Sequence, residues 1–161
     1  MEPRIEILSK KNLVGKSTRM SLVNNKTREL WHSFMVDRED ISNVIGTDLY
    51  SIQTYDKLNY FDDFSPQTEF TKWAAIEVDS INNIPYGFMN FAIDSGLYAV
   101  FTHKGPASEF PKTFQYILGV WLPKSEYELD HRPHFELLGK KYINEDSNSE
   151  EEVWIPIKKK D

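Results

Sequence analysis

The amino-acid sequence predicts an α+β fold in which two β-α-β-β units form one antiparallel sheet, with two helices on one face and a ligand cleft between the halves. Three observations lead to this prediction. The order strand, helix, strand, strand occurs twice, the elements have similar spacing in both copies, and 161 residues fit a single domain. The duplicated halves are expected at about residues 1–90 and 91–161 of this one domain.

The first half begins with a loosely alternating segment, residues 5–21, which predicts a strand. Four apolar residues then recur at helical spacing and predict an amphipathic helix over residues 27–37. Runs rich in β-branched and aromatic residues predict strands at 49–55 and 70–78, with a polar loop at 56–69 between them. The apolar helix positions are Leu30, Trp31, Phe34 and Met35.

The second half repeats this order, starting with a predicted strand at residues 96–103. A helix capped by Ser108 and stopped by Pro123 follows, and its apolar stripe is the most regular in the chain. Strands are predicted at 133–142 and 152–157. The stripe of this second helix consists of Phe110, Phe114, Ile117, Leu118 and Trp121.

Composition excludes several classes of function. The net charge of −6 argues against a protein that follows a nucleic-acid backbone, and it permits a cationic ligand. The absence of Cys excludes thiol nucleophiles, iron–sulfur ligation and thiolate zinc sites. No signal peptide and no membrane-spanning apolar run is present, so we expect a cytoplasmic protein without membrane contact.

Glu136 is the most informative acidic residue because it interrupts a locally apolar strand, Phe135-Glu136-Leu137-Leu138. A carboxylate that faces a closed space is costly unless it is paired or neutralised. Burial would raise its pKa, and a cationic ligand would lower the pKa again. The pattern alone fits a pocket position and a solvent-facing position on an edge strand equally well.

Histidines and acidic residues do not form a metal-binding pattern. His131 and His134 are close in sequence, but Pro133 breaks any helix that would align them, so we expect no metal site. The acidic segment 145–151 is expected to be a solvated connection. The sequence contains no phosphate loop, dinucleotide fingerprint, nucleophile elbow or HExxH motif, and we therefore expect no cofactor.

Short motifs from residue 96 onward resemble the GyrI-like family of effector-binding domains, which also occur at the C-terminus of AraC-type and MerR-type activators. The motifs are Gly96-Leu97-Tyr98-Ala99-Val100-Phe101-Thr102-His103-Lys104-Gly105-Pro106, Trp121-Leu122-Pro123-Lys124-Ser125, Arg132-Pro133-His134-Phe135-Glu136 and Glu152-Val153-Trp154-Ile155-Pro156-Ile157. The resemblance implies a duplicated fold with a cleft that binds hydrophobic, often cationic, small molecules. It implies that Glu136 and Trp121, which match family motifs, contact the ligand, and that Tyr98, Trp31 and Phe34, which match elements of the fold, do so as well.

Three functions follow from the residues and the resemblance together. The leading hypothesis is a stand-alone module that senses or sequesters amphipathic cations, without direct DNA binding because the first strand begins near Ile5. The alternative is a hydrolase in which Glu136 activates water as a general base and Tyr98 orients it or protonates the leaving centre. A third is binding to a protein partner such as gyrase, through acidic residues at 145–152. Taken singly, Trp31, Phe34 and Trp121 fit a hydrophobic core as well as a pocket.

Overall fold

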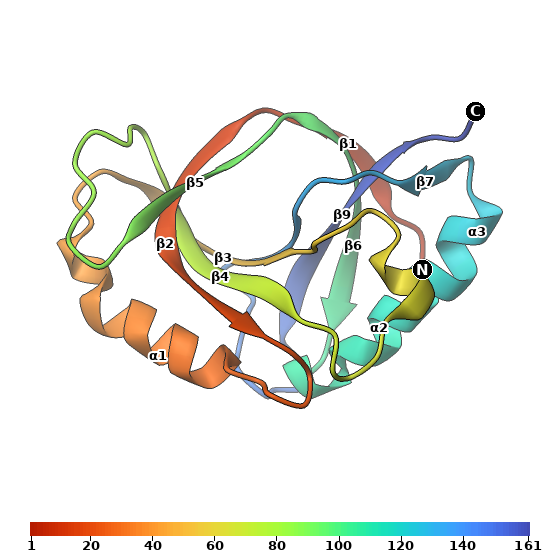
Figure 1. The fold of residues 1–161 in the computed structure, drawn as a ribbon, viewed down its shortest axis with the longest axis horizontal. Helices are drawn as coiled ribbons and strands as arrows, with labels where there is room; N and C mark the ends of the chain where they lie inside the picture. The colour runs from red at the N-terminus through yellow and green to blue at the C-terminus, as the bar shows by residue number, and fades with distance from the viewer.

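A nine-stranded antiparallel sheet, curled into a partial barrel, organises the chain, and α1 and α2 lie outside the curl (Figure 1). The computed structural model describes residues 1–161. The strands are β1 Arg4–Leu8, β2 Lys11–Met20, β3 Val44–Thr54, β4 Phe70–Val78, β5 Met89–Ile93, β6 Gly96–Lys104, β7 Tyr127–Leu129, β8 His134–Leu138 and β9 Glu150–Lys159. The helices are α1 Thr27–Asp37, α2 Phe110–Tyr116 and α3 Leu122–Lys124, and a π-helical turn at Ile117–Trp121 joins α2 to α3.

The strand order places β3 and β8 at the centre of the sheet. The order is β1-β6-β9-β8-β3-β4-β2-β5, and β7 pairs with β9. The units β2-α1-β3-β4 and β6-α2-β8-β9 therefore lie side by side and meet where β3 pairs with β8. In that pair Leu49 is opposite Leu138, and Gln53 is opposite His134. The predicted α+β fold, with one antiparallel sheet and two helices on one face, is confirmed.

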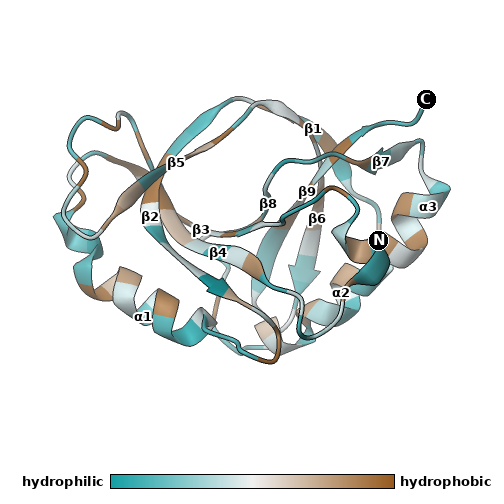
Figure 2. Cartoon of the chain, in the orientation of Figure 1, coloured by the Kyte–Doolittle hydropathy of each residue, from teal (hydrophilic) through white to brown (hydrophobic).

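Side chains alternate between the two faces of the sheet, and both faces are packed. The inner face, which the curl encloses, carries a cluster that includes Tyr98, Phe135 and Trp154. The outer face carries α1, which buries Phe34, and the α2 region, which buries Ile117. Brown and teal residues alternate along α1, as expected for an amphipathic helix (Figure 2). Between the two helices lie the outer sides of the central strands β3 and β8.

Several element boundaries differ from the predictions. The helix over residues 27–37 is confirmed, whereas the predicted strand at 5–21 divides into β1 and β2, which pair in different halves of the sheet. The short strands β5 and β7 were not predicted, because they form by pairing with β2 and β9 far away in the sequence. The predicted strand at 133–142 ends at Leu138, and the predicted loop at 56–69 contains a 3₁₀ turn at Tyr60–Asp63. No helix is long and apolar enough to cross a bilayer.

Candidate ligand-binding site

Glu136 lies on the outer face of β8, near the middle of the sheet. Its backbone is opposite Ser51 of β3 and Val153 of β9, and both of these side chains are buried. Glu136 itself is 8% exposed. Gln53 Nε2 donates a hydrogen bond of 3.2 Å to Glu136 Oε1, and no Lys, Arg or His nitrogen lies within 4 Å of the carboxylate. The structure therefore places Glu136 inside the molecule and excludes the edge-strand alternative.

Two further charged side chains share the outer face with Glu136. Lys72 of β4 is opposite Gln53, and it is half-buried. Glu151 of β9 is buried and lies two residues from Val153, which is the partner of Glu136. Because residues two apart in a strand point to the same face, both carboxylates and the ammonium group belong to one layer. Lys72 and Gln53 were not predicted as site residues. Glu151 was expected in a solvated connection, but it lies buried at the start of β9, because β9 begins at Glu150.

Burial dominates the electrostatics of this layer. It raises the pKa of Glu136 to about 7, against the opposing effects of Lys72 and the Gln53 hydrogen bond, and Glu151 adds to the rise. Burial also raises the pKa of Glu151 to about 7, again with Lys72 opposing. Burial lowers the pKa of Lys72, and the two carboxylates oppose that shift. Near neutral pH each of the two carboxyl groups is therefore present in both its protonated and its ionised form, and the ionised forms lack a direct ion-pair partner.

Aromatic side chains cover one end of the site. Tyr55 follows β3 and stacks on Tyr60, with ring centroids 3.5 Å apart and an interplanar angle of 11°. Phe61 connects this group to the helix, since its ring centroid lies 5.4 Å from that of Phe114 of α2. The His134 ring meets the Tyr55 ring edge-on at 5.1 Å. The segment that we predicted to be a polar loop therefore supplies an aromatic wall; the signal was Tyr60-Phe61 and Phe64 within an otherwise polar stretch.

Two polar atoms in this wall are buried without a hydrogen-bond partner, Tyr60 Oη and His134 Nδ1. Burial lowers the pKa of His134 to about 3, and the neighbouring Arg132 and His131 add to the effect, so the His134 ring is neutral at physiological pH. Burial raises the pKa of Tyr60 far above its ordinary value. A buried polar atom without a hydrogen bond costs free energy. A hydrogen bond between either atom and a guest molecule or water would therefore remove this cost.

The residues of α1 that the resemblance implied occupy different environments. Phe34 is fully buried in the core, where its ring contacts the rings of Trp31 and Phe88 at centroid distances of 5.6 and 6.0 Å. Lys16 of β2 donates to Ser33 Oγ at 2.9 Å, which fixes the flank of α1 that faces β2. Successive helix residues are rotated by about 100° about the helix axis. Trp31 therefore lies on the flank of α1 opposite to Ser33, towards β3 and β8. Trp31 is half-buried and can line the site, whereas Phe34 has no surface to offer a ligand.

Trp121 lies in the π-helical turn and packs over the second half of the sheet. Its ring meets that of Phe101 edge-on at 5.2 Å and stacks on Tyr127 of β7 at 6.3 Å. Phe101 is opposite Val153 in the sheet, so it lies in the same row as Glu136, two strands away. Two strand spacings are about 10 Å, and Trp121 therefore borders the region without contacting Glu136 in the structure.

Tyr98 lies on the other side of the sheet from Glu136. It is opposite Pro156 of β9, three residues from Val153, and an odd separation along a strand reverses the face. The Tyr98 side chain is fully buried in the inner cluster. Its hydroxyl donates to the carbonyl of Pro133 at 2.7 Å, and the Arg132 guanidinium lies 4.7 Å from its ring centroid. The structure therefore does not bring Tyr98 to Glu136, either as a catalytic partner or as a ligand contact.

The GyrI-like small molecule binding domain model matches residues 1–158. The chain belongs to this family. Among curated proteins, the GyrI-like chain is 33% identical over 93 residues to the transcriptional regulator BrlR of Pseudomonas aeruginosa. The alignment covers 57% of this chain and 34% of the regulator, so the chain spans about a third of that relative.

Solved structures share the GyrI-like fold at low identity. One is SAV2435 bound to tetraphenylphosphonium, with a TM-score of 0.67, 15% identity, and 98% and 94% of the two chains covered. Another is the EcmrR C-terminal domain, with a TM-score of 0.73, 12% identity, and coverage of 99% and 98%. A third is a hydrolase encoded by lin2189 from Listeria innocua, with a TM-score of 0.60, 10% identity, and coverage of 98% and 92%. The family model places this chain in the GyrI-like small-molecule-binding class, and one of its homologues is a transcriptional regulator.

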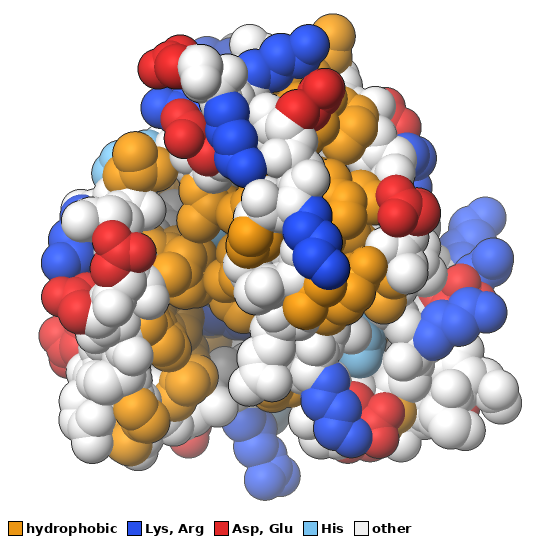
Figure 3. Space-filling model, turned by 90° about the vertical axis from the view of Figure 1, so that its right-hand side faces the viewer, with side chains coloured by type: hydrophobic (Ala, Val, Ile, Leu, Met, Phe, Trp, Pro, Cys, Tyr) orange, Lys and Arg blue, Asp and Glu red, His pale blue; other side chains and the backbone are white.

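Other features of this GyrI-like domain lie outside the Glu136 layer. An open pocket of about 620 Å³ lies between β2 and the start of α1, but only Leu30 and Met89 among its lining residues are hydrophobic. Nowhere do three His, Cys, Asp or Glu residues converge to hold a metal ion, and His131 is exposed while His134 is buried. From the α2 and α3 side, hydrophobic side chains line a hollow near the middle of the surface (Figure 3).

Proposed function

We propose that this GyrI-like domain binds amphipathic, cationic aromatic small molecules on the outer face of the sheet between α1 and α2, in order to sense or sequester them. The observation that carries the proposal is Glu136, a buried carboxyl group with a raised pKa and no ion-pair partner, adjacent to an aromatic wall. In the proposed complex a cation pairs with the ionised carboxylate, and aromatic rings contact the body of the guest.

The chemistry of the site favours a cation with delocalised charge. Such an ion loses less hydration energy on burial than a compact ammonium, and it gains from the faces of Tyr and Trp rings, about 0.5–2 kcal/mol for each contact. Tetraphenylphosphonium, the ligand in the SAV2435 structure, belongs to this chemical class. Neutral His134 and the aromatic rings complete a wall without positive charge, and Trp31 of α1 supplies a further half-buried ring.

Neither of the other functions expected from the sequence gains a specific observation. Hydrolysis by the pair Glu136 and Tyr98 requires both side chains on one face, and they lie on opposite faces. The acidic segment does not form one exposed patch, because Glu151 is buried and Glu145 accepts hydrogen bonds from the backbone N–H and hydroxyl of Ser108. We therefore propose neither function for this chain.

Quenching of tryptophan fluorescence by tetraphenylphosphonium tests the binding function. Half-buried Trp31 and Trp121 report on both flanks of the site, and we expect saturable quenching by the wild-type protein at pH 8. Glu136→Gln should weaken the affinity about tenfold to hundredfold, because a buried charged partner is lost.

Glu77→Gln is the matched control for this titration. Glu77 lies on the inner face of β4 and contacts Lys11 at 3.4 Å, away from the site. This variant should keep the wild-type affinity. Equal affinities of wild type and Glu136→Gln, or non-saturable quenching of a folded protein, would sink the proposal.

Phe61→Ala tests the aromatic wall. Removing this ring should weaken tetraphenylphosphonium binding about threefold to tenfold, the effect of losing one aromatic contact with a cation. Isothermal titration calorimetry gives the dissociation constant directly. Phe91→Ala removes a similarly half-buried ring on the inner face, 4.7 Å from Trp73, and should leave the affinity unchanged. Equal losses in the two variants would show that the effect is one of general stability and would remove Phe61 from the site.

A further inference from the structure

Lys16 and Lys72 both have side chains on the outer face of the sheet, but only Lys16 has hydrogen-bond partners there. Lys16 of β2 has three acceptors within 3.2 Å, including the carboxylate of Asp37. Lys72 is also half-buried, yet its ammonium group makes no hydrogen bond and no ion pair within 4 Å. Lys72 is therefore a cation that is partly removed from water without a direct partner.

The position of Lys72 directs this cation towards the two buried carboxylates. Its residue partner across the strands is Gln53, whose side-chain amide holds Glu136. Only β3 separates β4 from β8, so the backbones of Lys72 and Glu136 are about two strand spacings apart, roughly 10 Å in that direction. The flexible four-carbon stem of a lysine and the side chain of a glutamate span most of that gap. Glu136 and Glu151 are the two carboxylates whose charge acts on Lys72.

The charges of this layer can be counted. Lys72 contributes one positive charge, and Glu136 and Glu151 contribute two negative charges when both are ionised. His134 is neutral, and His103 is held by Thr113 Oγ1 at 2.7 Å and the carbonyl of Pro106 at 3.1 Å. With all three groups ionised, the layer carries one net negative charge.

We propose that Lys72 is a specificity-determining residue, an intrinsic counter-ion that leaves the binding site with one net negative charge and thereby selects monocationic over dicationic aromatic ligands. This inference rests on the proposed function and narrows its ligand class. A monocation neutralises the layer, whereas a dication leaves an excess positive charge beside the Lys72 ammonium in a region of low dielectric.

Coulomb's law makes the proposal quantitative. The repulsion between Lys72 and a ligand is proportional to the ligand charge, so removal of the lysine charge should help a dication by the square of the factor by which it helps a monocation. A neutral ligand of the same shape should not respond. Loss of steric hindrance, in contrast, would change the affinity of all three ligands by the same factor.

The experiment compares three ligands of matched shape by isothermal titration calorimetry at pH 8 and constant ionic strength. They are the monocation N-methyl-4-phenylpyridinium, the dication N,N′-dimethyl-4,4′-bipyridinium and neutral 4-phenylpyridine. For Lys72→Met we expect about tenfold tighter binding of the monocation and about hundredfold tighter binding of the dication, with the neutral compound unchanged. Lys72→Arg keeps the charge and should retain the wild-type ratio of the two cation affinities.

Control variants separate the failure of this inference from failure of the proposed function. Lys16→Met removes the lysine that is bound to Asp37 and should leave the ratio of affinities unchanged. If wild type binds the monocation and Glu136→Gln weakens that binding at least about tenfold, but Lys72→Met changes neither cation affinity, the proposed function stands and the role of Lys72 is refuted. Equal gains for all three ligands refute it as well. Absence of cation binding by the wild type overturns both. Lys72→Gln provides the same comparison if Lys72→Met does not fold.

Discussion

The gain in unfolding free energy of Glu136→Gln over wild type should be about 3 kcal/mol larger at pH 8 than at pH 4. The cause is the raised pKa of Glu136, about 7 in the folded protein against 4.5 for an unperturbed carboxyl. When the folded pKa lies above the unfolded pKa, the folded state binds more protons between the two values, so stability falls as the pH rises through that window. Glutamine carries no charge at any pH and escapes this loss.

The measurement is urea unfolding of wild type and Glu136→Gln at several pH values. Their difference in unfolding free energy should be constant below pH 4.5, grow between about pH 4.5 and 7, and be constant again above. The difference is informative because other groups shape each separate curve. Glu151 acts in the same direction as Glu136, and His134, with its pKa of about 3, costs stability as the pH falls below its unperturbed 6.5. A pH-independent difference would contradict the buried, unpaired state of Glu136.

Phe34→Ala should lower the free energy of unfolding by about 3–5 kcal/mol, the range for removing a large aromatic side chain from a core. The Phe34 ring is fully buried and packs against Trp31 and Phe88 under α1. The surrounding strands cannot collapse fully into the space, so a cavity adds to the lost hydrophobic burial. The protein that remains folded should bind tetraphenylphosphonium with nearly unchanged affinity, because Phe34 has no exposed surface.

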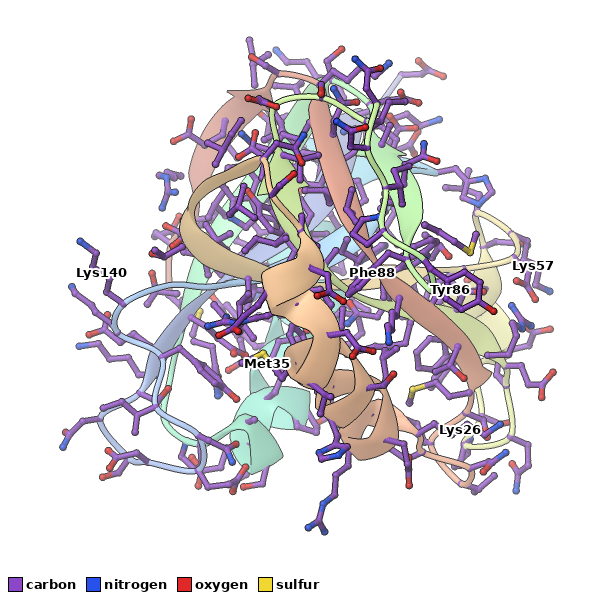
Figure 4. The ribbon with its side chains drawn as sticks, turned by 90° about the vertical axis from the view of Figure 1, so that its left-hand side faces the viewer. Lys26, Met35, Lys57, Tyr86, Phe88 and Lys140 are labelled. Atoms are coloured by element: carbon purple, nitrogen blue, oxygen red, sulfur yellow. The ribbon has the colours of Figure 1, made fainter.

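Urea unfolding and a fluorescence titration on the same preparation separate stability from binding. Met35→Ala is the matched control, since Met35 is the next residue of α1, is 43% exposed and extends from the side of the helix (Figure 4). This variant should change stability by less than about 1 kcal/mol. If Phe34→Ala weakened ligand binding strongly at little cost in stability, Phe34 would belong to the ligand site, as the family resemblance implied.

Local patterns were sufficient to predict most of the elements. The helix over residues 27–37 has the predicted ends, because its apolar residues recur every three or four positions within the segment itself. The strand at 70–78 was also predicted in full from its β-branched and aromatic residues. The short strands β5 and β7 could not be predicted, since five or three residues acquire strand geometry only by pairing with distant partners.

The candidate site was predicted in part. Glu136 is conspicuous in sequence because it interrupts an apolar strand, and the structure buries it between β3 and β9. The aromatic residues of the segment after β3 were overlooked because their neighbours are polar. In Figure 4 Lys57, which marks this segment, and Lys140, which marks the loop after β8, lie on opposite sides of the view.

The sequence by itself determined the family, the repeated order of the main strands and helices, and the absence of thiol chemistry, and it singled out Glu136 as a candidate ligand contact. Only the tertiary structure decided which side chains meet Glu136. Strand register assigns every residue to one of two faces, and a change of one residue reverses the assignment, so Tyr98 could be separated from Glu136 only once the β6–β9 and β8–β9 pairings were known. The β3–β4, β3–β8 and β8–β9 pairings bring Lys72, Gln53 and Glu151 from three other strands into the layer of Glu136. Those contacts depend on long-range hydrogen bonding, which leaves no periodic signal in any single segment.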